Sequence, residues 1–238
     1  MRAVIIAAGM GRRLWETTHM TPKTLLRFGN DTILSTIIEN FKSIGTNEII
    51  IVTGFKSKDI ISYVTVNNYF GISIRFIQNP EWRRGNGISV VAAQSVVGNE
   101  PFVLSMSDHI VSPAALKQIV NHPSNRNLLL VDSRSDEIFD IADATKVYVE
   151  LGHIRAIGKS LPSYNAIDCG IFRLNCRFFD AMKAQINDGK ESISAGIEKL
   201  IESNDMEAAF MDPSHYWMDL DTPESYKHGL NTAGKYLG

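Results

Sequence analysis

The sequence has few cysteines and no long hydrophobic run. Only Cys169 and Cys176 occur among 238 residues, and their spacing matches neither a zinc site nor a redox motif. We therefore expect both to be small buried side chains in a protein of a reducing compartment, the cytoplasm. No stretch reaches the ~20 apolar residues of a membrane helix. A glycine-rich basic turn follows the apolar N-terminus where a signal peptide would have its cleavage site.

Basic residues are not clustered either. The 24 lysines and arginines are spread along a chain of formal net charge -2, which argues against a nucleic-acid or anionic-membrane surface. We expect small-molecule partners and no nucleic acid, with phosphate binding confined to local sites, and the sequence leaves a homodimer open. With 44% hydrophobic residues the chain can bury one substantial core, so we expect a single domain over residues 1–238.

The first half of the chain alternates short apolar runs with helical patterns. Runs rich in Ile and Val predict buried strands at 2–8, 48–53, 73–78 and 101–106. Apolar residues at helical spacing predict helices at 33–44, 57–67 and 87–97. This alternation indicates an α/β fold, with a Rossmann-like, mainly parallel sheet between helices and an active site at the carboxyl ends of the strands.

The second half is richer in strands. We expect strands at 128–131, 144–150, 153–157, 167–174 and 207–211, with Leu151-Gly152 as a hairpin turn. Helices are predicted at 177–186 and 193–202. A last helix begins with Thr222 as its N-cap and Pro223 in its first position.

A glycine-rich segment, AAGMGRRL (residues 7–14), follows the first predicted strand. Gly9 and Gly11 carry no Cβ, so their backbone N–H groups can approach a triphosphate. Arg12 or Arg13 would supply charge-assisted bonds to phosphate oxygens. The segment is not the dinucleotide motif GxGxxG, because Leu14 replaces the third glycine, and it lacks the Gly-Lys-Ser/Thr of a Walker A sequence.

Lys23 directly follows a proline, which restricts the backbone around it. An isolated lysine in such a turn is usually solvated. The interpretation of Lys23 as a phosphate ligand therefore depends on the glycine-rich loop that precedes it.

Acidic residues follow strands in two distant parts of the chain. Asp108 follows the apolar run that begins at Phe102. An aspartate in this position could hold a hard divalent cation beside a phosphate loop. Alternatively, it could belong to a turn before the next helix. Asp219 and Asp221 lie in WMDLDTPE, where they could be solvated charges near the last helix. Convergence of two carboxylates on one Mg²⁺ makes better chemical sense, because Mg²⁺ takes one or two protein carboxylates plus substrate phosphates.

The pattern AAGxGxR, followed by PK and an apolar helix, resembles the signature of the nucleotidyltransferase superfamily that makes activated sugars and alcohols. The resemblance implies the nucleotide-diphospho-sugar transferase fold, with residues 1–121 mainly binding the NTP and 122–238 binding the acceptor. It also implies that Ala8, Gly9 and Gly11 surround the NTP phosphates. Arg13 and Lys23 would then stabilise charge on the α-phosphate and the leaving pyrophosphate. Arg12 stands where the family usually has a small hydroxyl residue, so either arginine could face the phosphates.

The same resemblance assigns the carboxylates and the nucleoside contacts. Asp108 matches the first metal aspartate of the family, and either Asp219 or Asp221 matches the second. A segment that contacts the nucleoside in the family corresponds here to residues 79–89, which implicates Asn79, Gly85 and Asn86. Taken only as local structure, Gly85 and Asn86 would form a turn.

Six further segments resemble the inositol-1-phosphate cytidylyltransferases more closely than the sugar-1-phosphate thymidylyltransferases. They are RGNG (84–87), MSDH (106–109), ATKV (144–147), IGK (157–159), YNAIDCGIF (164–172) and WMDLDT (217–222). The resemblance implies CTP as donor, a phosphorylated polyol as acceptor, and a CDP-alcohol and pyrophosphate as products. It makes Lys146, Lys159 and Asp168 candidates for the acceptor pocket.

Other acceptors and other classes of protein stay open. Inositol enzymes of this kind are often fused to a membrane transferase, and no membrane span is found here, so a sugar 1-phosphate, phosphocholine or aminoethylphosphonate remains an alternative acceptor. An NAD-dependent oxidoreductase would need a third glycine and an acid after the second strand, where Thr53-Gly54-Phe55 stands. A non-catalytic regulatory domain of the same fold would have little reason to keep Lys23, Asp108 and Asp221 together.

Overall fold

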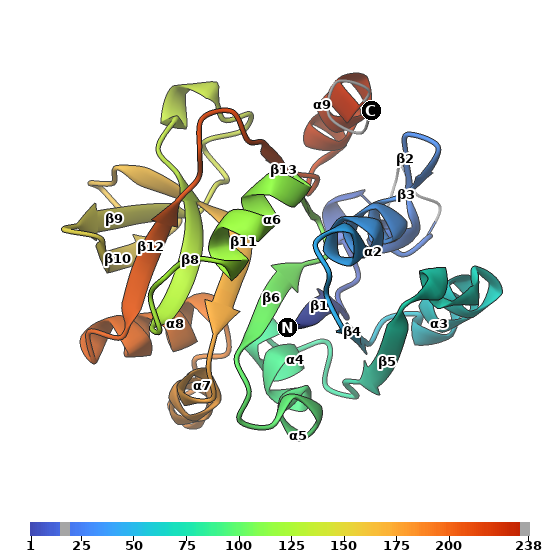
Figure 1. Cartoon of the computed structure of the whole chain (residues 1–238), viewed down its shortest axis with the longest axis horizontal. Coiled ribbons are helices and arrows are strands. Elements are labelled where there is room, and N and C mark those ends of the chain that lie inside the picture. Colours follow the sequence, from blue (N-terminus) through green and yellow to red (C-terminus); the bar gives the residue numbers. More distant parts are fainter. Residues whose placement is uncertain (15–19, 234–238) are drawn as a thin grey trace.

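The computed structural model describes residues 1–14 and 20–233, which are built around a nine-stranded mixed sheet (Figure 1). Four strands of the first half pair in parallel in the order β5-β4-β1-β6. They are β1 (Arg2–Ala7), β4 (Glu48–Thr53), β5 (Ser73–Gln78) and β6 (Phe102–Met106). The predicted parallel sheet of the first half is therefore confirmed.

Helices cover both faces of this sheet because side chains alternate along each strand. Ala3 and Ile5 of β1 belong to the core on one face, whereas Val4 and Ile6 belong to the core on the other. Figure 1 shows α4, α5 and α7 at the lower edge of the molecule and α2, α6 and α9 above them. The helices of the first half are α2 (Ile33–Ser43), α3 (Ser57–Val66), α4 (Asn86–Ala92), α5 (Gln94–Val97) and α6 (Pro113–Val120).

The single helix predicted at 87–97 is two short helices, α4 and α5. The N–H of Ala93 donates to the carbonyl of Val90 (3.0 Å), three residues back instead of four. This tighter turn separates the two helices.

The second half extends the sheet through β11, which is antiparallel to both β6 and β8. The pairings of β11, β8, β12, β10 and β9 form a closed circuit, because β9 also pairs with the start of β11. The strands are β8 (Asn127–Asp132), β9 (Lys146–Glu150), β10 (His153–Gly158), β11 (Ala166–Leu174) and β12 (Met206–Phe210). The helices α7 (Arg177–Asn187) and α8 (Ile193–Glu202) lie between β11 and β12.

Two predicted local features of this half are confirmed. Leu151 and Gly152 join β9 to β10 with φ angles of 51° and 80°, as a hairpin turn with two left-handed residues requires. Helix α9 (Pro223–Ala233) begins at Pro223, and the Thr222 hydroxyl accepts a hydrogen bond from the Ser225 N–H (3.1 Å).

Short elements were not predicted from the sequence. Strand β7 (His109–Val111) pairs antiparallel with β13 (Trp217–Asp219), and β2 (Arg27–Phe28) pairs with β3 (Asp31–Thr32). The described residues also include four 3₁₀ segments: η1 (Arg12–Leu14), η2 (Lys23–Leu25), η3 (Asn68–Gly71) and η4 (Ser135–Glu137). Pairing of β7 with β13 matters most, because it places Asp219 opposite His109.

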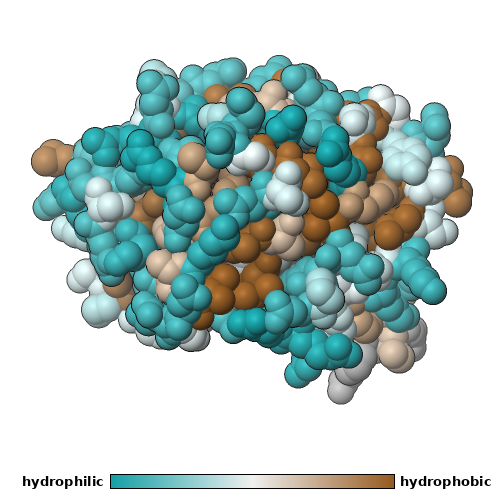
Figure 2. Space-filling view, turned by 90° about the horizontal axis from the view of Figure 1, so that it is seen from below, coloured by the Kyte–Doolittle hydropathy of each residue, from teal (hydrophilic) through white to brown (hydrophobic). Residues whose placement is uncertain are grey.

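Hydrophilic side chains cover much of the face that carries α4, α5 and α7, with hydrophobic side chains visible between them (Figure 2). Within residues 1–14 and 20–233, no helix combines the length and apolar character that crossing a bilayer requires.

Candidate functional site

The glycine-rich loop connects β1 to η1 at the carboxyl end of the parallel strands. Gly11 has a φ of 64°, and a Cβ there would lie 2.8 Å from Cβ of Lys23, so both conformation and space demand glycine. A Cβ added to Gly9 would meet no described heavy atom within 4 Å. The loop therefore packs against Lys23 on one side and is open on the other.

The Lys23 ammonium lies between two carboxylates that are distant in sequence. Its side chain is buried, and Nζ donates to Asp108 Oδ2 at 2.6 Å and to Asp221. Burial lowers the pKa of Lys23, but the charges of Asp108 and Asp221 outweigh it and raise the pKa above its ordinary value. Lys23 is therefore a permanent positive charge at this point.

Asp108 also contacts the residue that follows it. Nδ1 of His109 donates to Oδ1 of Asp108 (2.7 Å), and the His109 ring stacks on Trp217 with 5.8 Å between ring centroids. Gly170 leaves room for this ring, because a Cβ on Gly170 would lie 2.4 Å from His109 Cδ2. The β7–β13 pairing brings Asp219 Oδ2 to 4.0 Å from His109 Nε2.

Crowded carboxylates shift the pKa values in this group. Burial and the nearby charges of Asp108 and Asp221 raise the pKa of Asp219 to about 7, although His109 opposes the shift. Burial lowers the pKa of His109, but Asp219 and Asp108 outweigh it and raise the pKa to about 9. Burial raises the pKa of Asp108, whereas Lys23 and His109 bring it well below its usual range. At neutral pH Asp108 is therefore ionised and His109 protonated, while Asp219 is close to half protonated.

The residues of this group are suited to a divalent cation. Asp108, His109 and Asp219 each have a possible ligand atom, and these atoms lie within 4.8 Å of one another. His109 would have to release its extra proton before one of its nitrogens could bind an ion. Oδ1 of Asp219 is buried and has no hydrogen-bond partner among the described residues. Carboxylate oxygens are the ligands that hard divalent cations prefer, so the donor set fits such an ion. Asp221 lies outside this set of three, and its carboxylate accepts hydrogen bonds from Lys23 and Arg13.

Two pockets meet at these carboxylates. A pocket of about 300 Å³ is lined by predicted nucleotide-binding residues, namely Gly9, Gly11, Arg12, Arg13, Lys23 and Asn86. A pocket of about 390 Å³ is lined by Lys159, Asp168 and Asp219. Asn86, Met106, Asp108 and Asp221 line both. A molecule in either pocket would therefore reach Asp108 and Asp221.

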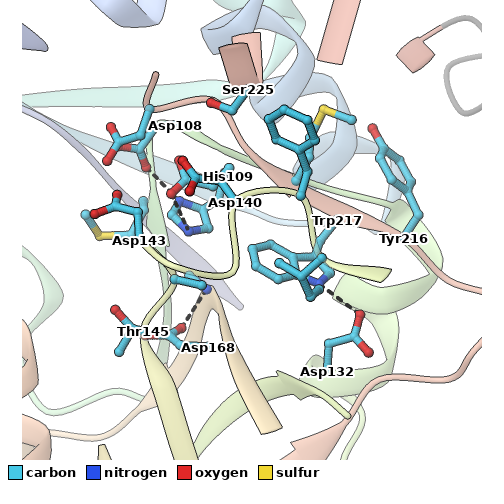
Figure 3. Close-up of a pocket in the computed structure, with 18 of the residues that line it drawn as sticks. Asp108, His109, Asp132, Asp140, Asp143, Thr145, Asp168, Tyr216, Trp217 and Ser225 are labelled. Atoms are coloured by element: carbon cyan, nitrogen blue, oxygen red, sulfur yellow. Dashed lines mark hydrogen bonds and ion pairs between the residues drawn. The ribbon is translucent and has the colours of Figure 1, made fainter. Parts of the chain in front are cut away.

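The larger pocket has an acidic and aromatic lining (Figure 3). In this view Asp108, His109 and Asp168 follow one another along one side, while Trp217 and Asp132 lie on the other. The Trp217 indole N–H donates to Asp132 Oδ2 at 3.0 Å, which fixes the ring. Oδ1 of Asp168 accepts the N–H of Gly170 (2.7 Å), and burial raises the pKa of Asp168 to about 6.

A network of ion pairs also connects residues of the two pockets. Asp143 accepts hydrogen bonds from Lys159 (2.7 Å) and from Arg13, and Arg13 also donates to Asp221. Burial lowers the pKa of Arg13, but Asp143 and Asp221 outweigh it and raise the pKa. Arg13 and Lys159 are thus held next to the junction of the pockets.

Four of the predicted site residues lie elsewhere. Ala8, Asn79, Gly85 and Lys146 are not among the described residues that line either pocket. Asn79 is buried, where it donates to Ser89 (2.9 Å) and accepts the N–H of Glu81 (2.9 Å). The Lys146 ammonium donates to the carbonyl of Ala142 (3.0 Å). Asn79 therefore stabilises the turn at Glu81, and Lys146 stabilises the loop that contains Ala142.

Sequence reasoning did not identify His109 or Asp143. His109 could have been suspected, because it directly follows Asp108 and offers a metal-binding nitrogen. Asp143 carries no such signal, since it lies in a loop and meets Arg13, 130 residues away, only in the folded chain.

Similarity to known proteins extends along most of the chain. A family model described as a MobA-like NTP transferase domain matches residues 3–160. Several curated relatives, each aligned over at least 94% of this chain, carry the name "Bifunctional IPC transferase and DIPP synthase". The one from Thermococcus kodakarensis is 32% identical over 100% of this chain and 52% of its own length. The one from Aquifex aeolicus is 30% identical over 99% and 51%. The chain spans about half the length of the curated relatives it matches.

Solved structures share the fold. The inositol-1-phosphate CTP transferase from T. maritima superimposes with a TM-score of 0.86 at 23% identity, covering 98% of this chain and 96% of that one. A putative glucose-1-phosphate thymidylyltransferase from Bacillus anthracis gives a TM-score of 0.83 at 21% identity, covering 98% and 95%. The expected mixed sheet of the nucleotide-diphospho-sugar transferase fold is therefore confirmed.

Proposed function

Since this chain belongs to the family of MobA-like NTP transferase domains, we propose that it is a Mg²⁺-dependent nucleotidyltransferase that transfers CMP from CTP to a phosphorylated polyol such as inositol 1-phosphate. The products are a CDP-alcohol and pyrophosphate. The observation that carries the proposal is the junction of two pockets at Asp108 and Asp221, with the Lys23 ammonium bonded to both carboxylates.

The smaller pocket is assigned to the NTP. Its glycine loop leaves backbone N–H groups open to phosphate oxygens, and Arg12, Arg13 and Lys23 supply positive charge. The larger pocket is assigned to the acceptor, with Lys159 near its phosphate and Asp168 near its polar groups. In this proposal residues 1–238 act as one domain, in which 1–121 mainly bind the nucleotide and 122–238 bind the acceptor.

The reaction is a direct displacement at phosphorus. An oxygen of the acceptor phosphate attacks the α-phosphorus of the NTP, the bond to the bridging oxygen breaks, and pyrophosphate leaves with its electron pair. The acceptor phosphate is already ionised at neutral pH, so no protein base is needed. Lys23 and Arg13 stabilise the negative charge that develops on the phosphate oxygens.

Mg²⁺ would be held by Asp108 together with Asp219 or Asp221. Bound there, it would neutralise charge on the α-phosphate and orient that group for in-line attack. The buried Asp219 oxygen without a partner supports this assignment. Asp221 would have to exchange its bonds to Lys23 and Arg13 for the ion.

Similarity supports the choice of substrates. The names of the relatives include IPC transferase, and the T. maritima structure is that of an inositol-1-phosphate CTP transferase. One observation favours a second class of acceptor, such as phosphocholine or aminoethylphosphonate. The larger pocket combines the half-buried Asp168 carboxylate with the indole of Trp217, and such surroundings also suit a cationic nitrogen.

The test is pyrophosphate release with Mg²⁺ present, with CTP, UTP, dTTP, GTP and ATP each paired with inositol 1-phosphate, phosphocholine, aminoethylphosphonate and several sugar 1-phosphates. We expect a signal with CTP and inositol 1-phosphate. Lys23→Met should reduce it by about 100-fold or more, whereas Lys42→Met removes an exposed lysine paired only with Glu39 and should leave it unchanged. No release from folded protein with any pair would favour the non-catalytic regulatory domain.

A further inference from the structure

Residues 84–87, which follow β5 and begin α4, are bound to residues 191–193 at the start of α8. Oε2 of Glu191 accepts the N–H of Gly85 (3.0 Å), and Oε1 accepts Nε of Arg84 (2.9 Å). The Glu191 carbonyl accepts the N–H of Gly87 (2.8 Å). The side-chain oxygen of Asn86 accepts the N–H of Ile193 (2.8 Å). Two segments more than 100 residues apart are therefore joined by side-chain and backbone bonds in both directions.

The two glycines of this turn are explained by the same contact. A Cβ on Gly85 would lie 2.4 Å from the Glu191 carbonyl oxygen, and a Cβ on Gly87 would lie 2.7 Å from it. Neither glycine has a left-handed φ, so conformational freedom is not the reason for glycine here. The backbone of Glu191 approaches so closely that only glycine fits at both positions.

Glu191 itself lines neither of the two pockets, but its partner Arg84 and the neighbouring Asn86, which is bound to Ile193, do. Arg84 and Asn86 line the smaller pocket beside Trp82, and Asn86 also lines the larger one. The exposed fractions of the Arg84 and Glu191 side chains are 41% and 26%, so the pair lies at the rim of the smaller pocket. A change at Glu191 can reach a nucleotide only through Arg84 and the turn.

We infer that Glu191 is a positioning residue for the nucleotide site, supplied by the acceptor half of the chain. It holds the N–H of Gly85 and the guanidinium of Arg84, and thereby sets the shape of the wall that the nucleotide contacts. This inference rests on the proposed function in one respect, the assignment of the smaller pocket to the NTP. It predicts that nucleotide affinity depends on a residue that does not touch the nucleotide.

The experiment compares Glu191→Ala with Glu191→Gln. Alanine removes the acceptor for Gly85 and one of the two carboxylates that bind Arg84, the other being Glu81 at 2.5 Å. Glutamine keeps an oxygen for Gly85 and loses the charge. The matched control is Glu202→Ala, which removes another exposed acid of the same half, paired with Lys199 at 2.6 Å on α8. Binding of CTP with Mg²⁺ is measured by calorimetry without acceptor, and the KM values for CTP and acceptor are measured separately.

We expect Glu191→Ala to weaken CTP binding by about tenfold, which corresponds to the loss of one hydrogen bond to a charged group. Glutamine should restore part of this affinity. The acceptor KM and the thermal midpoint should stay close to the wild-type values, and Glu202→Ala should change none of these quantities.

Unchanged CTP affinity, or equal increases in both KM values, would overturn the inference. If Glu191→Ala fails to fold, Glu191→Gln gives the comparison by itself, because it keeps the shape of the side chain and loses the charge that binds Arg84. A wild-type protein that binds CTP but releases no pyrophosphate would refute the proposed reaction and still allow the affinity test. A wild-type protein that binds no NTP would overturn both.

Discussion

Replacement of Gly170 by alanine tests how closely the larger pocket is built around His109. Gly170 has a φ of 73°, and its added Cβ would lie 2.4 Å from His109 Cδ2. A left-handed backbone costs an L-residue about 1–2 kcal/mol, and forcing a packed ring aside adds about 1–3 kcal/mol. We therefore expect Gly170→Ala to lower the free energy of unfolding by about 2–5 kcal/mol.

Gly152 supplies the matched control. Its φ is 80°, but a Cβ there would meet no described heavy atom within 4 Å. Gly152→Ala should therefore lose only the backbone contribution of about 1–2 kcal/mol. Urea unfolding followed by circular dichroism gives both free energies, and equal losses in the two variants would refute the packing argument around His109.

The same pair of variants separates stability from catalysis. A displaced His109 ring loses its 2.7 Å bond to Asp108, so the carboxylate is no longer held in place. We expect turnover of Gly170→Ala to fall by about tenfold to 100-fold at a temperature where it is folded. Turnover of Gly152→Ala should match the wild type. Full turnover of folded Gly170→Ala would show that His109 does not position Asp108.

Three further predictions concern charges. Asp108→Asn preserves side-chain shape but removes a charge, and we expect pyrophosphate release to fall by about 100-fold or more with an unchanged circular dichroism spectrum; near-normal release would contradict the assignment of Asp108 to the metal site. Lys159→Glu should raise the KM for the acceptor more than the KM for CTP, and equal increases would place Lys159 outside the acceptor pocket. Burial raises the pKa of Asp168 from its ordinary 3.8 to about 6, so the folded chain binds this proton more tightly than the unfolded chain and loses stability as pH rises from about 4 to 6. The thermal midpoint of Asp168→Asn should therefore exceed that of the wild type at pH 7 but not at pH 3.5, and a difference independent of pH would exclude this account.

Much of the fold was predictable because its signals are local. Apolar runs located β4 and β5, and the caps and turns at Thr222 and Leu151 depend on a few neighbouring residues. Strands β7 and β13 were missed, since three residues give too short a pattern to distinguish a strand from a loop. The predicted long helix at 87–97 divides because Ala93 bonds to Val90 in a tighter turn.

Site residues could be predicted where they lie directly after a predicted strand. Asp108 and the glycine loop could be selected because the carboxyl ends of parallel strands converge. Lys23 was selected from the proline before it and from its place after the glycine loop in the family signature. Lys146 was selected from the resemblance to the inositol-1-phosphate cytidylyltransferases. In the structure its ammonium donates to the Ala142 carbonyl, and Lys146 is not among the described residues that line either pocket. A positioning residue such as Glu191 could not be predicted, because no pattern in the neighbouring sequence distinguishes it from other acidic residues.

The sequence by itself determined the alternating strands and helices, the glycine-rich loop of the kind that binds phosphate, and the acidic residues available to bind a metal. Only the tertiary structure decided that Asp219 joins Asp108 and His109, whereas Asp221 binds Lys23 and Arg13. It also decided that Glu191 meets Gly85. The physical reason is that periodicity and caps act between near neighbours, whereas these contacts join residues brought together by packing of the sheet and its helices.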